Sequence, residues 1–237
     1  SCRGWANKIL VIDDLADREH DCDYLLDQTV GRCPSNYRPL TPQHCDVLTG
    51  AEFALLRPQF SQARARSLSR RNVPSSKIER VLISYGAVDA HNMTARTLKG
   101  LEASQFTGVA EVIMSGASAH NESVQTLIET LSFSCTMHFD VEDMAGLMTN
   151  ADLAFGAGGM TSWERCCVGL PTLITVLADN QKMVAQELEK AGAAIVLGPH
   201  DTVSVETIRE QVLHLNPNPQ QQTETTQDAS RVCEGQG

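Results

Sequence analysis

Two patterns of apolar and polar positions alternate along this chain, continuous apolar runs and segments with helical spacing. Short continuous apolar runs are typical of strands buried on both faces, and they lie at residues 81–84, 109–114, 151–155, 171–176 and 193–197. A shorter strand is expected at residues 136–139. Segments with helical spacing lie between the runs, at residues 92–101, 122–131, 141–148 and 180–191. Strands separated by helices predict an α/β fold with a doubly wound parallel sheet.

The region before this sheet is organised differently. A strong strand signal, KILVIDD at residues 8–14, stands close to the start with no partner before it, and residues 21–28 contain a second short strand. We therefore expect the chain to begin in the middle of a domain. A basic, polar stretch at residues 61–76 predicts a linker or an exposed helix. The segment at residues 216–237 is rich in Gln, Thr, Asn and Pro, and we expect its first part to be a loose loop.

The most informative segment is a glycine turn between a buried strand and a helix, at residues 150–173. Gly156, Gly158 and Gly159 allow a sharp turn, and Thr161 or Ser162 can cap the helix that follows. The free N–H groups and dipole of such a helix favour a phosphate or diphosphate. The spacing matches neither the dinucleotide fingerprint nor the P-loop, so a tight structural turn without a ligand remains the alternative.

Other features place this turn in a wider site. Glu164 falls in the first turn of the helix, where its carboxylate can accept hydrogen bonds from a diol such as a ribose. In doubly wound sheets, ligands bind beyond the carboxyl ends of the strands. The loops expected there, which together can line one crevice, are residues 85–92, 115–121, 156–162 and 177–181.

Composition narrows the class of protein. With 237 residues and 42% hydrophobic residues, the chain can build a packed core. A net charge of -10 argues against binding to nucleic acids or anionic membranes. Eight cysteines without a CxxC spacing indicate reduced thiols, with neither disulfides nor a metal site. No apolar run approaches the roughly 20 residues of a membrane span, and we expect a cytoplasmic protein.

Two aspartates after the first strand have two interpretations. Asp13 and Asp14 can coordinate a metal or act as acid and base, or they can stabilise a turn in which Asp14 caps or pairs with Arg18. We favour the turn. Met144 and Met148 stand at helical spacing and are predicted to belong to the core rather than to a ligand site.

Several segments, in this order, carry a resemblance: IDDLADREHDCDYLLDQ, FALLRPQF, ISYGAVD, VEDMAGLMTNADLAFGAGGMTSWERCCVGLPTL and ADNQ. They resemble the UDP-2,4-diacetamido-2,4,6-trideoxy-β-L-altropyranose hydrolases of pseudaminic acid biosynthesis, bacterial relatives of GT-B glycosyltransferases. The resemblance extends over residues 8–214, and residues 233–237 look like the start of the family's closing segment.

The resemblance implies two Rossmann-like domains with a UDP-sugar in the cleft between them. Water would break the bond between the anomeric carbon and the UDP oxygen, with inversion, and neither a metal nor a cofactor is implied. Family members carry an N-terminal GxGHxxR-like loop whose histidine is the favoured base, and that motif does not occur here. We therefore expect a fragment or shortened form that binds UDP yet hydrolyses poorly, and the catalytic residues stay unassigned. His20 belongs to a later family segment and does not replace that base.

The implied domains are the C-terminal part of an N-terminal Rossmann-like domain at residues 1–60, a linker at 61–78, a largely complete UDP-binding Rossmann-like domain at 79–214, and a flexible tail with the start of the closing segment at 215–237. Gly86 would approach the diphosphate or sugar, although Ala87 stands where a second glycine is commoner. Glu164 would bind the ribose, and residues 139–144 would contact the uracil. The expected diphosphate ligands are Gly158, Gly159, Met160, Thr161 and Ser162.

Asn180 and Gln181 would reach the sugar or its phosphate, but Asn180 can equally cap the helix that follows. His91 and His120 lie in the same group of loops, where they can touch the diphosphate or sugar, and we favour the interpretation as solvated residues. A GT-B glycosyltransferase and a UDP-binding module without activity are the alternative functions. The unpartnered first strand also predicts an exposed sheet edge and self-association.

Overall fold

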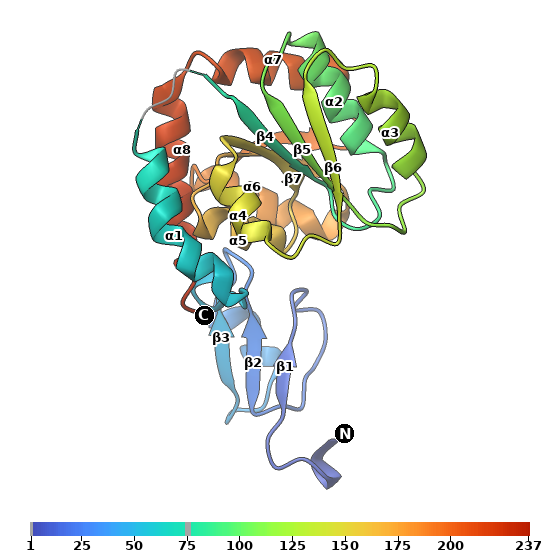
Figure 1. Ribbon diagram of the computed structural model, residues 1–237. Helices are drawn as coiled ribbons and strands as arrows, with labels where there is room; N and C mark the ends of the chain where they lie inside the picture. Colours follow the sequence, from blue (N-terminus) through green and yellow to red (C-terminus); the bar gives the residue numbers. More distant parts are fainter. Residues whose placement is uncertain (1, 74–76) are drawn as a thin grey trace.

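A computed structural model describes residues 2–73 and 77–237, and its centre is a parallel sheet (Figure 1). The strand order is β6-β5-β4-β7-β8-β9, and every neighbouring pair is parallel. This is the doubly wound α/β arrangement predicted from the sequence. The strands are β4 (Arg80–Ser84), β5 (Val109–Met114), β6 (Ser134–Phe139), β7 (Leu153–Ala157), β8 (Thr172–Val176) and β9 (Ile195–Pro199).

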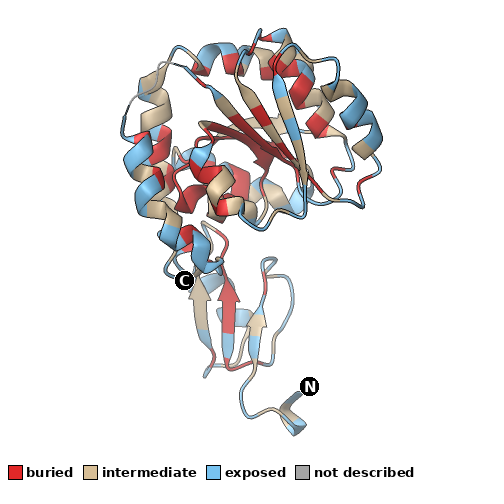
Figure 2. Cartoon of the chain, viewed as in Figure 1, coloured by how far each residue is buried: buried red, intermediate tan, exposed pale blue. Residues whose placement is uncertain are grey.

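Helices cover both faces of this sheet, and Figure 2 shows the buried strands between them. On one face lie α2 (Met93–Ala103), α3 (Asn121–Ile128) and α7 (Val205–Leu215). On the other lie α4 (Met144–Asn150), α5 (Thr161–Cys167) and α6 (Lys182–Lys190). Alternate strand residues supply the two cores: Phe155 packs toward α2, whereas its neighbour Ala154 packs toward α5. Both faces of the sheet are therefore buried under helices, which explains the continuous apolar runs along its strands.

A smaller parallel sheet forms the N-terminal unit. Its strands are β1 (Leu10–Ile12), β2 (Tyr24–Asp27) and β3 (Asp46–Thr49), in the order β1-β2-β3. The strand β3 was not predicted. Leu10 and Ile12 of β1 are 58% and 56% exposed, so the edge expected to be unpartnered is apolar and open to solvent. The 3-10 turns are η1 (Cys2–Gly4), η2 (Pro34–Asn36), η3 (Arg38–Leu40), η4 (Ala51–Phe53) and η5 (Asp179–Gln181).

The segment at residues 61–78 was expected to be a linker, with an exposed helix as the alternative for residues 61–76, and it is largely a helix. Helix α1 (Pro58–Arg71) begins with a proline at its first position, where the missing N–H costs no hydrogen bond. It packs against α4, α5 and α8, and Phe60, Ser67 and Arg71 are buried. Of the remaining linker, residues 74–76 lie outside the described residues.

The expectation of a loose tail was wrong. Helix α8 (Pro219–Val232) follows Asn218, whose side chain accepts the N–H of Gln221 as an N-cap. The helix packs against α5 and lies beside α1 (Figure 1). Thr225, Thr226 and Ala229 form its buried face, and these small side chains let the two helices approach closely.

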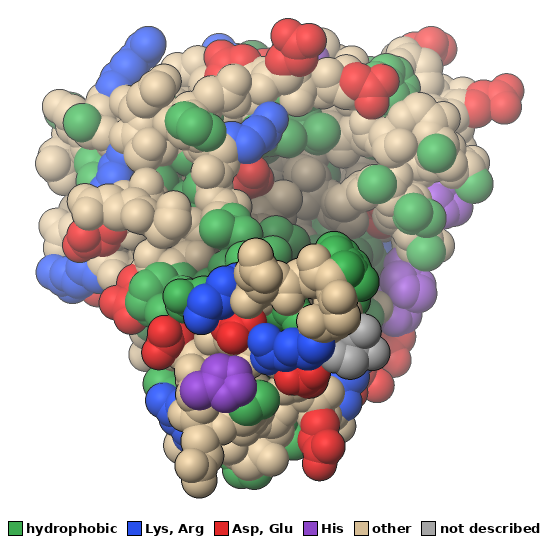
Figure 3. Space-filling model, turned by 90° about the horizontal axis from the view of Figure 1, so that it is seen from below, with side chains coloured by type: hydrophobic (Ala, Val, Ile, Leu, Met, Phe, Trp, Pro, Cys, Tyr) green, Lys and Arg blue, Asp and Glu red, His purple; other side chains and the backbone are tan. Residues whose placement is uncertain are grey.

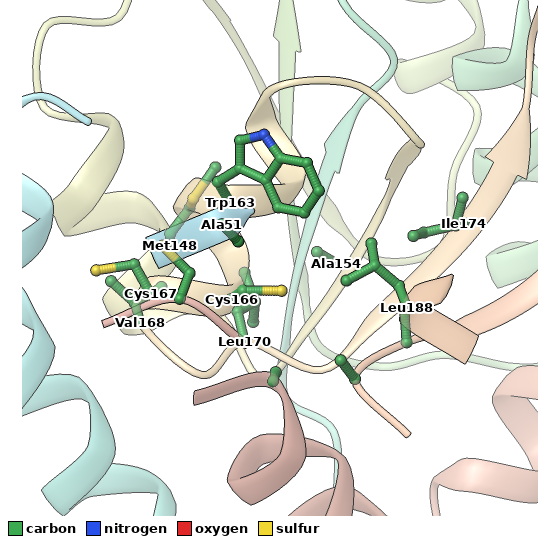
Figure 4. Packing of buried hydrophobic residues seen from close by; sticks show 14 of the residues in the cluster. Ala51, Met148, Ala154, Trp163, Cys166, Cys167, Val168, Leu170, Ile174 and Leu188 are labelled. Carbon is green, nitrogen blue, oxygen red and sulfur yellow. The ribbon is translucent and has the colours of Figure 1, made fainter. Parts of the chain in front are cut away.

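The core around α5 joins the two parts of the chain (Figure 4). Trp163 and Cys166 of α5 lie in one cluster with Met148 of α4 and with Ala51, which follows the N-terminal sheet. Met148 is buried and Met144 packs against the same cluster, so the core interpretation of these methionines is confirmed. The N-terminal unit is thus anchored to the larger domain by apolar contacts close to the glycine turn.

Figure 3 shows the molecule from below, with acidic and basic side chains interspersed on this face. Within the described ranges, no helix combines the length and apolar character that a bilayer crossing requires.

Candidate functional site

The glycine turn lies at the carboxyl edge of the sheet, next to the turn after β4. Ser84 pairs with Gly156 in register, so β4 and β7 end side by side. Gly86 follows β4 with a φ of +85°, which favours glycine. A methyl group at Gly86 or Gly159 would meet no atom within 4 Å. Both glycines therefore leave open space at the sheet edge where ligands bind in this architecture.

The start of α5 differs from the sequence prediction. Met160 occupies the N-cap position without a side-chain hydrogen bond, and Thr161 is the first helical residue. The predicted cap by Thr161 or Ser162 is therefore wrong. Ser162 is buried, and its Oγ accepts a hydrogen bond of 3.0 Å from Nη2 of Arg165. A buried cation thus holds the hydroxyl that the resemblance assigned to the diphosphate.

Backbone amides of the turn are still available to a ligand. The N–H groups of Ser162 and Trp163 donate to the carbonyls of Gly159 and Met160, which tightens the first turn. In the part of the chain that the structure describes, the N–H groups of Gly159, Met160 and Thr161 donate to no other residue. Consecutive free amides at a helix start are suited to an anion.

A pocket of about 360 Å³ opens in front of this turn, between the larger domain and the N-terminal unit. It brings together Gly158, Gly159, Met160, Asn180 and Gln181, five of the residues singled out from the sequence. The predicted site residues outside its lining are Gly86, Thr161, Ser162 and Glu164. From the N-terminal unit come Ile12, Asp13, Asp14, Gln28 and Thr29.

Asn180 and Gln181 have different surroundings within the pocket. Gln181 stands at the N-cap position of α6, and its Oε1 accepts the N–H of Leu177 at 3.0 Å. This bond fixes the side chain across the end of β8. Asn180 is exposed within η5, and it does not occupy the cap position that was the alternative to ligand contact.

Glu164 lies just outside the pocket lining, beside the junction with the N-terminal unit. Its Oε1 lies 3.7 Å from Nη2 of Arg57, the residue before α1, and its side chain is 17% exposed. Burial raises the pKa of Glu164, while the charges of Arg57 and Arg165 act in the opposite direction. Arg57 was not identified from the sequence, because its relation to Glu164 is purely tertiary.

Asp13 and Asp14 play different parts on the other wall. Asp13 is buried and accepts hydrogen bonds from the N–H of Ala16 and the Tyr37 hydroxyl, at 2.8 and 2.9 Å. Its other oxygen lies 3.2 Å from Nη2 of Arg18, so Arg18 pairs with Asp13 and not with Asp14. The favoured turn interpretation holds for Asp13, whereas Asp14 is exposed at the pocket.

Gln28 and Thr29 were missed by the sequence analysis. They follow β2 directly, and the end of a parallel strand was the available signal. The Oε1 of Gln28 accepts the N–H of Leu55 at 3.0 Å, so this side chain also ties the wall to the segment leading into α1.

Histidines are distributed around the site rather than within it. The ring of His91 stacks on that of His200 with centroids 3.5 Å apart, and His20 Nε2 lies 3.7 Å from Asp13 Oδ2. No histidine lines the pocket within the described part of the chain. Across the described residues, no group of three or more His, Cys, Asp or Glu side chains is placed to hold a metal ion.

Comparisons with known proteins agree with this architecture. The spore coat polysaccharide biosynthesis protein SpsG of Bacillus subtilis (strain 168) is 29% identical over 166 residues, which are 68% of this chain and 47% of that protein. A UDP-N-acetylglucosamine–N-acetylmuramyl-(pentapeptide) pyrophosphoryl-undecaprenol N-acetylglucosamine transferase from Hahella chejuensis is 30% identical over 145 residues, 59% of this chain and 40% of the transferase. This chain therefore spans less than half the length of either relative.

Solved structures share the fold. The Acinetobacter baumannii MurG structure matches with a TM-score of 0.64 at 17% identity, covering 98% of this chain and 65% of MurG. The chain has the GT-B-like α/β fold, with a Rossmann-like C-terminal domain. The family model for the glycosyltransferase family 28 C-terminal domain matches residues 81–234, so this chain belongs to the glycosyltransferase family 28 C-terminal domain family.

Proposed function

We propose that this chain binds the UDP part of a UDP-linked sugar at the glycine turn and serves its hydrolysis to UDP and free sugar. The carrying observation is the pocket in which Gly158, Gly159 and Met160 face Asn180, Gln181 and the N-terminal unit. The free N–H groups of Gly159, Met160 and Thr161 can donate to the diphosphate oxygens, and the carboxylate of Glu164 can accept from the ribose hydroxyls. Gly86 would approach from the neighbouring strand end.

These groups suit the departure of UDP. When the bond to the anomeric carbon breaks, negative charge accumulates on the diphosphate oxygen, and preorganised amides stabilise it without reorganising. A separate base must activate the water. The chain described here therefore supplies leaving-group stabilisation, and we assign none of its residues as that base.

A diacetamido-trideoxy sugar of the pseudaminic acid route is the substrate that the resemblance of the sequence segments supports. Transfer of the sugar to an acceptor is the second candidate, because one of the relatives bears the name of a transferase. The products separate the two. Free sugar formed without an acceptor supports hydrolysis, and acceptor-dependent UDP release supports transfer.

Calorimetric titration with UDP, UMP and ADP tests the binding step. We expect selective binding of UDP, weakened by on the order of 1–3 kcal/mol in Glu164→Ala, where the ribose hydroxyls lose a buried acceptor. Circular dichroism of the same samples verifies the fold. A folded wild-type chain that binds none of the three nucleotides would contradict the proposal, and UDP binding without turnover would identify a binding module.

A further inference from the structure

Beneath the glycine turn lies a buried arginine that the proposed function has not used. Arg165 is 2% exposed on α5. Its Nη2 donates to the carbonyl of Ala157 at 2.6 Å and to Ser162 Oγ at 3.0 Å, and both acceptors flank the turn. The guanidinium also lies against Gly156, where any side chain would clash with Nη1. The absence of a side chain at Gly156 is thus what makes room for this cation at the ends of β4 and β7.

The charge of Arg165 has no counter-ion in contact. Among the described residues, no carboxylate forms an ion pair with it, and its buried Nε has no hydrogen-bond partner. The adjacent Glu164 is turned toward Arg57. Burial lowers the pKa of Arg165 to about 10, so the guanidinium remains charged at neutral pH. An uncompensated cation in a dry interior is costly, and a protein retains one chiefly where something offsets it.

A second buried arginine shows what a purely structural role looks like. Arg71 of α1 is also buried, and burial lowers its pKa to about 9. Its Nε donates to the Val168 carbonyl, Nη1 to that of Ala151 and Nη2 to that of Met148. Two of these carbonyls lie at the C-terminal end of α4, where the negative end of the helix dipole compensates the charge. The Nε and both terminal nitrogens of Arg71 therefore find acceptors within the fold, whereas the buried Nε of Arg165 finds none.

We propose that Arg165 is a positioning residue for the diphosphate, and that the ligand dianion is its missing counter-ion. This inference rests on the proposed function. The cation acts through the turn rather than by touching the ligand: its field favours negative charge above Gly158 and Gly159. Its hydrogen bond to Ser162 Oγ also orients that hydroxyl and leaves the hydroxyl hydrogen to donate.

Parallel measurements of the affinities for UDP and for uridine, which lacks the diphosphate, distinguish the effect of the Arg165 charge from its effect on packing. In Arg165→Met and Arg165→Gln we expect UDP affinity to fall at least tenfold and uridine affinity to change less than twofold. Arg165→Lys keeps the charge and should retain most of the UDP preference. The matched control is Arg71→Met, in which the UDP-to-uridine ratio should equal that of the wild type even where its melting temperature falls.

The inference is overturned if a folded Arg165→Gln keeps the wild-type UDP-to-uridine ratio. It is also overturned if Arg165→Lys loses that ratio as fully as Arg165→Gln. Thermal melts identify the variants that fold, and the Gln variant keeps a polar amide at this position should the Met variant unfold. Failure of the wild type to bind UDP would instead contradict the proposed function itself.

Discussion

Arg57 Nη2 lies 3.7 Å from Glu164 Oε1, and this ion pair joins the residue that leads out of the N-terminal unit to the first turn of α5. Arg57 also donates to the Glu142 carbonyl and lies over the ring of Phe60. The proposed ribose acceptor is therefore adjusted electrostatically by a residue at the junction of the two units.

UDP affinity should fall as the pH is lowered, and the fall should begin at a higher pH than the ordinary pKa of a glutamate would predict. Burial raises the pKa of Glu164. The ionised form of Glu164 is thus disfavoured in the folded protein. The free energy of unfolding therefore falls as pH rises through this pKa, and protonation at lower pH restores it. Ribose hydroxyls need the ionised form, so binding changes in the opposite sense. Titrations between about pH 7.5 and pH 5 should show the decline. The terminal phosphate of UDP also gains a proton in this range, so Glu164→Gln should bind weakly and show a smaller decline than the wild type.

Arg57→Gln should move that decline to higher pH. The cation stabilises the Glu164 carboxylate, so its removal raises the pKa of Glu164 further. The midpoint of UDP affinity against pH measures the shift. Arg66→Gln removes an equal charge from an exposed position of helix α1, which follows Arg57, and serves as the control. Equal midpoints in the two variants would contradict the proposed effect of Arg57 on the pKa of Glu164.

Two glycines of the turn should respond differently to alanine. At Gly159 a methyl group meets no atom, so stability should change by less than about 0.5 kcal/mol while UDP affinity falls. At Gly156 it would clash with Arg165 and lie 2.8 Å from the Ser84 carbonyl oxygen, so the fold should lose roughly 1–3 kcal/mol. Urea unfolding and UDP titration measure both effects. Gly116→Ala, also unobstructed but after β5, should change neither quantity.

Tyr37→Phe should destabilise the N-terminal unit by about 1–3 kcal/mol at neutral pH, because two buried carboxylates lose a donor. The Tyr37 hydroxyl lies 2.9 Å from Asp13 and 2.8 Å from Asp27. Burial raises the pKa of Asp13, but its hydrogen bonds, that of Ala16 first, outweigh burial and lower the pKa. A lowered carboxyl pKa contributes stability above the unfolded value, and the contribution is lost as pH falls through the folded value.

The deficit of Tyr37→Phe should therefore shrink near pH 3 relative to pH 7, close to the ordinary aspartate range. Urea unfolding at the two pH values measures it, with the exposed Tyr24→Phe as a matched control. Equal deficits at both pH values would show that the carboxylates do not carry the effect.

The exposed edge of β1 leads to a proposal of self-association. Leu10 and Ile12 project from a strand whose outer side is unpaired within the described sheet. Light scattering should show a concentration-dependent rise in mass, which the double variant Leu10→Lys/Ile12→Lys suppresses. A wild type that stays monomeric at all concentrations would contradict this.

Much of the larger domain could be predicted because its strands are buried on both faces. Val81, Phe155 and Leu173 belong to runs in which every residue packs against apolar neighbours, and such runs can be recognised in the sequence alone. Helix α8 was hidden because its buried face consists of Thr225, Thr226 and Ala229, which carry no apolar stripe. The burial of such residues depends on α5, which the sequence alone does not place beside them.

The site divides in the same way. Gly158, Gly159 and Met160 are adjacent in the chain, so their shared location followed from local turn chemistry. Arg165 stands next to Glu164, yet the two side chains point to different partners, and only the packing of α5 decides this. The opposite wall required the N-terminal unit to be placed in three dimensions.

The order of strands in the large sheet has a consequence for how the chain folds. The central strand β4 pairs on one side with β5 and on the other with β7, so that Val81 meets Leu153 across a long stretch of intervening chain. Closing such a loop costs entropy before the contact repays it, which makes parallel pairing slow. During synthesis, one flank of β4 must wait until β7 has left the ribosome. The glycine turn directly after β7 is therefore among the late parts of the domain to acquire its surroundings.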